Sequence, residues 1–412
     1  MQDKMLKILF VPSDNNATSG AFISMVKLCS ILQGEFGCQV QVLLRCKGNG
    51  QYLLSENNIS FKVINSFNWF IPYKPRTLKR KFKRFLCNLW MPLTRVYNKI
   101  AVKRISCYIQ KEQFDIVHIN TSCTYVGAVA ALKNKVPFVW HIREFLEEDQ
   151  ERCIWNKKYA YELMAQADKV ITISNGLYDK YSKNIPKANI VKIYNGIDDK
   201  RFRCLPRQIF MDSIIHLVIV GSINKSKGQD QAILACKELY DKGIRNFELN
   251  IVGKNSEYAK ILEKQVEKLG LNNNIKFTGP CKEVEHLYQK ADIALMCSAS
   301  EAFGRVTVEA MMSGALVIGA NSGGTLELIE DGVTGILYES GNSSDLAKKI
   351  IVAIREKERM NKIAQRGQDF MIKNMTADKN AENIYYIYKE ILASERKKDE
   401  EYKSRSCNSY IQ

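Results

Sequence analysis

The chain has 412 residues, of which 46% are hydrophobic and 25% charged, and this size predicts two globular domains rather than one core. It contains no run of 18 or more apolar residues, which excludes a membrane-spanning helix, and we expect no export signal. The net charge is +17, and the 12 cysteines and four histidines show no metal-ligand spacing. We therefore expect reduced thiols and no bound metal.

Short apolar segments alternate with longer segments of helical period along most of the chain. Because continuous apolar strands separated by helices are typical of parallel sheets covered on both faces, this pattern predicts an α/β protein. Strands are predicted at 7–11, 39–44, 61–64, 114–119, 138–141 and 169–173, and again at 214–220, 247–252, 275–278, 292–296, 315–318 and 335–338. Helices are predicted at 22–32, 229–240, 258–269 and 343–354.

The two strand series predict two doubly wound domains. We expect the first over residues 1–198 and the second over 199–377. A helix is predicted at 378–392, and the polar, charged residues 393–412 are predicted to form a disordered tail.

A basic insertion occupies residues 74–104, with eleven Lys and Arg residues and no Asp or Glu. Large apolar residues interrupt the charges at near-helical spacing: Leu78, Phe82, Phe85, Leu86, Leu89 and Trp90. This composition is typical of an amphipathic helix that lies on an anionic membrane. The alternatives are a solvated helix packed by its apolar face and a nucleic-acid site, although no nucleic-acid-binding module is recognisable.

A strand of the second domain leads into Glu301, a turn at Gly304 and a helix that carries Glu309. The first N–H groups of a helix, here around Val306 and Thr307, lack intrahelical partners and suit a phosphate. A carboxylate accepts two neighbouring hydroxyl protons, so each Glu can hold a vicinal diol of a sugar or ribose. The alternative is a solvated loop residue and a charge at a helix start.

Two further segments connect a strand to a helix start. Residues 221–228 lack the residue order of a P-loop and the glycine spacing of a dinucleotide-binding loop. In residues 15–21, Gly20 at a helix start offers backbone N–H groups to an anion, although an ordinary connecting turn has the same composition.

The segment from Glu301 to Glu309, followed by Ala310 and Met311, resembles the signature of retaining GT-B glycosyltransferases of family four (glycosyl transferases group 1), of the bacterial cell-surface polysaccharide type. The resemblance covers nearly the whole chain and is carried further by residues 194–202, 321–329, 331–337 and 378–392. The last of these segments is similar to the C-terminal helix that crosses back to the N-terminal domain in the family. It implies a GT-B fold: two Rossmann-like domains face a central cleft, the first binds the acceptor and the second the nucleotide sugar.

The resemblance also implies roles for individual residues in donor binding. Glu309 would hold the ribose hydroxyls and Glu301 the hydroxyls of the donor sugar. The backbone at Phe303 and Gly304 would meet the sugar, and the backbone at Val306 and Thr307 would meet the distal phosphate.

Lys227 matches the lysine that clamps the donor diphosphate in the family, whereas Ser222 stands where the family has an arginine. Lys225 or Arg305 could supply the second cation. By the same resemblance, the Gly20 loop faces the acceptor and the donor phosphate. It also puts His141 in the cleft near the donor sugar, so that the catalytic candidates are His141, Lys227 and Glu301.

Structural roles are also open for His118, Arg143 and Glu144. His118 ends a predicted strand and is either a core residue or an acceptor contact. Arg143 and Glu144 follow His141 closely and could pair with each other on a loop.

The predicted function is retaining transfer of a sugar from a UDP- or GDP-sugar to an acceptor, lipid-linked by our interpretation, in cell-surface polysaccharide or glycolipid synthesis. No cofactor, metal or nucleic acid is expected, and the predicted location is cytoplasmic, at the inner face of the membrane. The alternatives are a GT-B sugar-nucleotide epimerase and a non-catalytic membrane-associated scaffold, which only Ser222 favours.

Overall fold

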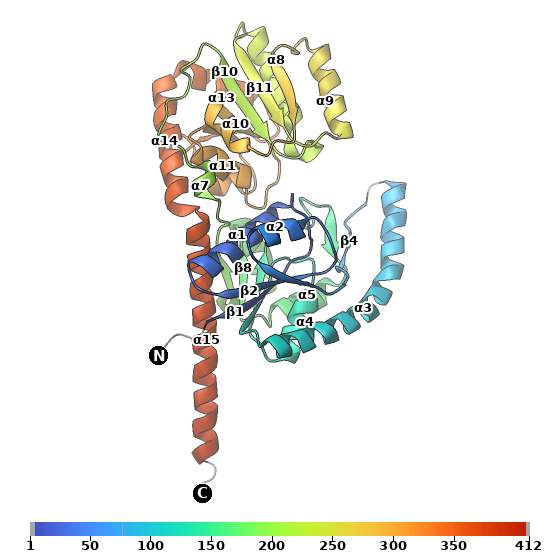
Figure 1. The fold of residues 1–412 in the computed structure, drawn as a ribbon. Helices are drawn as coiled ribbons and strands as arrows, with labels where there is room; N and C mark the ends of the chain where they lie inside the picture. The colour runs from blue at the N-terminus through green and yellow to red at the C-terminus, as the bar shows by residue number, and fades with distance from the viewer. Residues whose placement is uncertain (1–4, 76, 409–412) are drawn as a thin grey trace. The chain divides into compact units, whose positions relative to one another are not determined.

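The computed structural model describes residues 5–75 and 77–408, and the chain divides into two compact units (Figure 1). Unit 1 consists of Met1–Gly196 with Ala377–Gln412, and unit 2 of Ile197–Thr376. Each unit contains one parallel sheet with helices, so the α/β prediction is confirmed. No helix within the described part of the chain is long and apolar enough to cross a membrane.

The main sheet of unit 1 has seven parallel strands. In spatial order they are β3 (Ser60–Val63), β2 (Gln39–Leu44), β1 (Lys7–Val11), β5 (Ile116–Ile119), β6 (Phe138–Ile142), β8 (Lys169–Thr172) and β9 (Ile190–Lys192). A separate antiparallel pair is formed by β4 (Phe70–Pro72) and β7 (Arg152–Ile154).

Alternate residues of β1 point to opposite faces of this sheet. Phe10 belongs to the core beneath α1 (Gly20–Gly34) and the C-terminal helix α15 (Ala377–Asn408). Val11 faces α4 (Val126–Lys133), which approaches so closely that a Cβ at Gly127 would lie 2.8 Å from a Val11 methyl. The remaining α-helices of unit 1 are α2 (Gly50–Glu56), α3 (Leu78–Glu112), α5 (Lys157–Met164) and α6 (Asn175–Tyr181).

Helix α15 differs from its prediction at the C-terminal end. The sequence predicts a helix ending at residue 392 and disorder beyond it, but the helix continues to Asn408. Residues 393–408 contain no Gly or Pro and are rich in Glu, Lys and Arg, which are good helix formers even where no apolar face marks a helix. The last four residues of the predicted tail, 409–412, lie outside the described residues.

Helix α3 contains most of the basic insertion and extends beyond it. It begins after Thr77, whose side chain accepts a hydrogen bond from the Arg80 N–H, and includes Pro92. Figure 1 shows α3 bending along its length, as expected where a proline removes a backbone hydrogen bond. The second half packs against α4 through one face that includes Asn98 and Ile105. Arg76 of the insertion lies outside the described residues.

The sheet of unit 2 has six parallel strands: β12 (Ile275–Gly279), β11 (Phe247–Val252), β10 (Ile215–Val220), β13 (Ile293–Met296), β14 (Leu316–Ala320) and β15 (Ile336–Tyr338). Its α-helices are α7 (Asp199–Phe202), α8 (Gln229–Asp241), α9 (Glu257–Lys268), α10 (Val284–Lys290), α11 (Arg305–Met312), α12 (Thr325–Leu328), α13 (Ser343–Arg355) and α14 (Lys357–Asn374). Strand order reverses between β10 and β13, and ligands of such sheets bind beyond the carboxyl ends of the strands at this point.

Candidate functional site

The loops that follow β10 and β13 lie against each other in unit 2. The N–H of Ala299 donates to the carbonyl of Ser226 at 3.3 Å. Gly228 has a φ of +68°, and a Cβ there would lie 2.3 Å from the carbonyl oxygen of Cys297. Only glycine fits both the backbone conformation and this close approach. The sequence thus brings two segments 70 residues apart to one edge of the sheet.

Lys227 and Glu301 meet at this edge. The Lys227 ammonium forms an ion pair and hydrogen bond with Glu301 Oε1, which also accepts a hydrogen bond of 3.0 Å from the Ser298 hydroxyl. Both side chains remain partly exposed, 30% for Lys227 and 20% for Glu301. A ligand at the sheet edge can therefore reach a cation and a carboxylate that already touch.

Helix α11 starts from Gly304, which has a φ of +90°. Glu309 lies 7% exposed on this helix, and its carboxylate Oε1 is 3.3 Å from Arg305 Nη2. The prediction that the Thr307 N–H is unpaired is wrong, because the turn tightens and this N–H donates to the Gly304 carbonyl at 3.0 Å. The Val306 N–H has no partner among the described residues and remains available to an anion.

A second turn, which includes Gly324, packs against the Glu301 segment. The N–H of Gly324 donates to the Glu301 carbonyl at 2.8 Å, and Phe303 is buried beside it. This turn belongs to residues 321–329, whose resemblance to the family gave them no chemical role. Its place in the fold indicates that it fixes the backbone between Glu301 and Gly304.

Among the candidates for a second cation, Arg305 lies next to Glu309, whereas Lys225 is exposed and has no partner among the described residues. Ser222 is exposed too, and its carbonyl accepts a hydrogen bond of 3.1 Å from Gln229 Nε2. Lys227, Arg305 and the Val306 N–H are thus the positive groups of this segment.

In unit 1, four buried side chains form a hydrogen-bonded chain from α15 to β6. The Tyr388 hydroxyl is 2.7 Å from His118 Nδ1, and His118 Nε2 is 3.2 Å from His141 Nδ1. Arg143 Nη2 lies 3.3 Å from the same nitrogen of His141. Both histidines are fully buried, and His141 Nε2 has no hydrogen-bond partner.

These contacts determine which nitrogens carry protons. Burial raises the pKa of Tyr388 well above its usual value, so its hydroxyl stays protonated and donates to His118. Burial, and then the charge of Arg143, lower the pKa values of His118 and His141 well below 6.5. Arg143 is always a donor, so His141 Nδ1 accepts and Nε2 carries the proton. His141 is therefore a neutral imidazole with one N–H free to donate.

Arg143 and Glu144 do not pair with each other through their side chains. The Arg143 guanidinium donates to the side-chain oxygens of Asn120 and Asn195, at 2.7 Å for Asn120. The Glu144 carboxylate accepts from the Ser122 N–H at 3.0 Å and from the Thr121 hydroxyl. The interpretation of a loop ion pair is wrong, because both residues are buried at the carboxyl edge of the sheet.

Sequence reasoning gave no role to Asn120, Asn195 or Tyr388. Asn195 belongs to a segment that resembles the family, but its contact with Arg143 needs the fold. Tyr388 is 270 residues from His118, and no pattern in the sequence signals the contact. Gly20 begins α1 as predicted, after Ser19, whose hydroxyl donates to Asp14 Oδ2 at 2.9 Å.

Two family models match the chain. The model described as glycosyl transferases group 1 matches residues 211–370, and the model described as glycosyltransferase family 4 matches residues 35–201. The chain belongs to the group 1 glycosyltransferases of family 4. The predictions of this family and of a transferase enzyme are confirmed.

Known proteins resemble this glycosyltransferase over most of its length. N-acetyl-alpha-D-glucosaminyl L-malate synthase of Bacillus anthracis is 23% identical over 314 residues, which cover 73% of this chain and 81% of that protein. The crystal structure of HepE from Anabaena in complex with UDP has a TM-score of 0.76 at 23% identity and covers 94% of this chain and 100% of that chain.

A structure of the lipopolysaccharide outer core galactosyltransferase WaaB has a TM-score of 0.67 at 17% identity and covers 92% of this chain and 99% of that one. Likeness to these glycosyltransferase structures confirms the predicted GT-B fold with two Rossmann-like halves.

Proposed function

We propose that this glycosyltransferase moves a sugar from a UDP- or GDP-sugar to a lipid-linked saccharide, with retention of anomeric configuration, in the synthesis of a cell-surface polysaccharide or glycolipid. The observation that carries the donor proposal is the meeting of Lys227 and Glu301 beside the start of α11. HepE has been crystallised with UDP and with UDP-glucose, which supports a nucleotide-sugar donor. WaaB is a galactosyltransferase of the lipopolysaccharide outer core, which supports a cell-surface product.

In the proposed chemistry, the bond between the anomeric carbon and the diphosphate oxygen breaks as the acceptor oxygen bonds to the same face of that carbon. The acceptor proton passes to the departing diphosphate. Lys227 and the Val306 N–H stabilise the charge that develops on the diphosphate, so we propose that no metal ion is required. Glu301 accepts hydrogen bonds from the donor sugar and Glu309 from the ribose.

Binding of the donor would also replace the ion pair that Lys227 and Glu301 form in its absence. Each of these side chains has a partner now, which holds both near the positions where they would contact the donor. A diphosphate placed at Lys227 and a sugar diol at Glu301 would replace one ion pair with two charge-assisted interactions. The proposal for His141 is a hydrogen bond from its free Nε2–H to an oxygen of the donor sugar.

The experiment has two stages. Thermal unfolding with a panel of UDP- and GDP-sugars identifies the donor, because a ligand raises the midpoint according to its affinity. NMR of the product formed with that donor and a lipid-linked acceptor, with EDTA present, then gives the anomeric configuration. A product with inverted configuration, or loss of transfer in EDTA, would contradict the proposal.

The alternatives give different results in the same assays. A sugar-nucleotide epimerase would convert the donor to its epimer without an acceptor. A non-catalytic scaffold would transfer no sugar, and the variants Glu301→Ala and Lys227→Ala would be indistinguishable from the unchanged protein.

We also propose that α3 attaches the enzyme to an anionic membrane at the inner face. Ten large apolar side chains on one side of α3 are 38–84% exposed, and we call them the exposed apolar face: Leu78, Phe82, Phe85, Leu86, Leu89, Trp90, Leu93, Val96, Tyr97 and Ile100. A helix packed by these residues, the alternative interpretation, would have buried them. Burial of one such side chain is worth about 1.5–3 kcal/mol, so a membrane that covered this face would bind firmly.

Flotation with vesicles of phosphatidylcholine and phosphatidylglycerol tests this membrane attachment. We expect Phe82→Ser with Leu93→Ser to abolish flotation, because both side chains would insert into the membrane. The matched control is Leu205→Ser with Ile261→Ser, which removes two apolar side chains of unit 2 that are also largely exposed. Equal flotation of both double variants would refute the attachment.

A further inference from the structure

An open groove of about 1020 Å³ lies in unit 1 between the second half of α3 and the edge strand β3. Five cations line it: Lys47, Lys62, Lys103, Arg104 and Lys111. No Asp or Glu is among the lining residues, and none of the five forms an ion pair within the described part of the chain. Cations gathered in a concave site concentrate positive potential and favour an anion.

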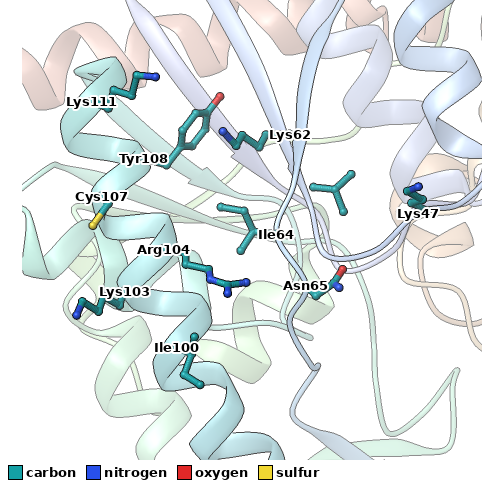
Figure 2. A pocket seen from close by; sticks show the side chains of 11 residues that line it. Lys47, Lys62, Ile64, Asn65, Ile100, Lys103, Arg104, Cys107, Tyr108 and Lys111 are labelled. Atoms are coloured by element: carbon teal, nitrogen blue, oxygen red, sulfur yellow. The ribbon is translucent and has the colours of Figure 1, made fainter.

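Apolar side chains line the interior of the groove. Val63, Ile64 and Ile100 line it together with Tyr108. The Lys62 ammonium lies 4.7 Å from the centre of the Tyr108 ring, and the Tyr108 hydroxyl donates to Gln41 of β2. Figure 2 shows Arg104 extending from α3 into the space toward Ile64.

The groove continues the exposed apolar face of α3. Successive residues of a helix are rotated by roughly 100°, which puts Arg104, Tyr108 and Lys111 on the same side of α3 as the exposed apolar face. Ile100 belongs to both the apolar face and the groove. Along this one side, apolar side chains therefore give way to cations, which matches the change from acyl chains to phosphates at a membrane surface.

We propose that this groove binds the phosphate headgroup of an anionic membrane lipid. The proposal rests on the membrane attachment proposed for α3 and adds a site with a defined chemical preference. Arg104 can donate two parallel hydrogen bonds to a phosphate, and Lys62 and Lys111 add point charges. The apolar residues of the groove would contact the glycerol and the first methylenes of the lipid.

The test compares two variants of equal charge. The groove variant carries Lys62→Gln, Arg104→Gln and Lys111→Gln. The matched control carries Lys158→Gln, Lys183→Gln and Lys187→Gln, three exposed lysines of unit 1 that have no partner within the described residues and lie outside the groove. Both variants keep α3 and its apolar face, and their thermal midpoints report whether they fold.

We expect the groove variant to bind phosphatidylglycerol vesicles roughly a hundredfold more weakly than the unchanged protein, because several cations at an anionic surface act together. The control should lose less than about threefold, since its cations lie outside the groove. On vesicles of phosphatidylcholine alone, the unchanged protein and both variants should bind equally.

Equal losses of vesicle binding in the two variants would contradict the proposed lipid site, because non-specific electrostatic attraction would then explain the binding. Failure of the unchanged protein to float would overturn both the groove and the membrane attachment. Titration with inorganic phosphate distinguishes a lipid headgroup from a free phosphate as the ligand. If the groove variant lost phosphate binding but still bound vesicles, the groove would be a site for a free anion instead. Transfer to a detergent-solubilised acceptor reports the glycosyltransferase activity independently of all these outcomes.

Discussion

Lys227 and Glu301 are the two residues on which the proposed donor site depends most. Each lies in a loop after a strand, and the ion pair between them restricts a flexible lysine and a glutamate at the carboxyl edge of the sheet. The side chains are partly exposed, so this pair adds little to stability, about 0–1 kcal/mol for surface pairs. Its importance lies in placement rather than in stability of the fold.

Replacing Lys227 by Ala should lower kcat at least a hundredfold. Loss of one preorganised donor to developing charge costs about 3–4 kcal/mol in other enzymes. Lys225→Ala is the matched control, because Lys225 is an exposed lysine of the same loop, and we expect less than about a twofold change. Steady-state kinetics with the identified donor measure both, and equal effects would remove Lys227 from the mechanism.

Replacing Tyr388 by Phe should change the protonated nitrogen of His118. Without the tyrosine hydroxyl, His118 Nδ1 loses its donor, and the free energy of unfolding should fall by about 1–3 kcal/mol. Nitrogen NMR of histidine-labelled protein reports this directly, because the chain has only four histidines. Tyr386→Phe, on the same helix but 61% exposed, is the control. Unchanged ring signals in Tyr388→Phe would contradict the inferred hydrogen-bonded chain.

At the scale of the elements, the tight contact between the loops after β10 and β13 depends on Gly228. Gly228→Ala should weaken donor binding and lower stability, because the new Cβ would collide with the Cys297 carbonyl. Gly270→Ala is a matched control with nearly the same backbone, a φ of +70°, and open space around it. Donor titration followed by thermal unfolding should show loss of donor affinity only for Gly228→Ala.

Most strands and several helices could be predicted because their apolar periodicity is local. β1, β2 and β11 have the predicted bounds, and α8 and α13 differ from theirs by one residue. The short strands β4, β7 and β9 were missed, because three residues carry no period. The sequence shows the apolar run of α3 but does not predict its exposure, since burial depends on what packs against it.

Only those parts of the candidate site whose residues are close together in the sequence could be predicted. Glu301, Gly304 and Glu309 lie within nine residues, and their order implied a loop and a helix start. The closing of the first turn by Thr307 was not predictable, because it depends on the exact geometry of the helix start. The contacts of Arg143 and Tyr388 were also beyond prediction, since they join separate elements.

At the scale of the molecule, the four tryptophans report on one unit alone. Trp69, Trp90, Trp140 and Trp155 all belong to unit 1. His118 and His141 have lowered pKa values in the folded state, so the unfolded state binds more protons below about pH 6.5. The stability of unit 1 should therefore be constant above about pH 7.5 and fall as the pH drops below 6.5, by up to about 1.4 kcal/mol per pH unit for each histidine.

Urea unfolding followed by tryptophan fluorescence measures this dependence between about pH 8 and 5.5, a range above the usual titration of carboxylates. A midpoint that stays constant over this range would contradict the inferred neutral state of the two histidines.

Helix α15 completes unit 1 although it follows unit 2 in the chain. Its residues Ala381, Ile384 and Tyr388 belong to the same core as Phe10 of β1. During synthesis, a ribosome releases all of unit 2 before α15 exists, so the first unit to begin is the last to close. Nascent chains shorter than about 380 residues expose the core beneath α1 and leave His118 without Tyr388. We therefore expect unit 2 to fold before unit 1 is complete, and a chain interrupted before α15 to be prone to aggregation through its exposed core.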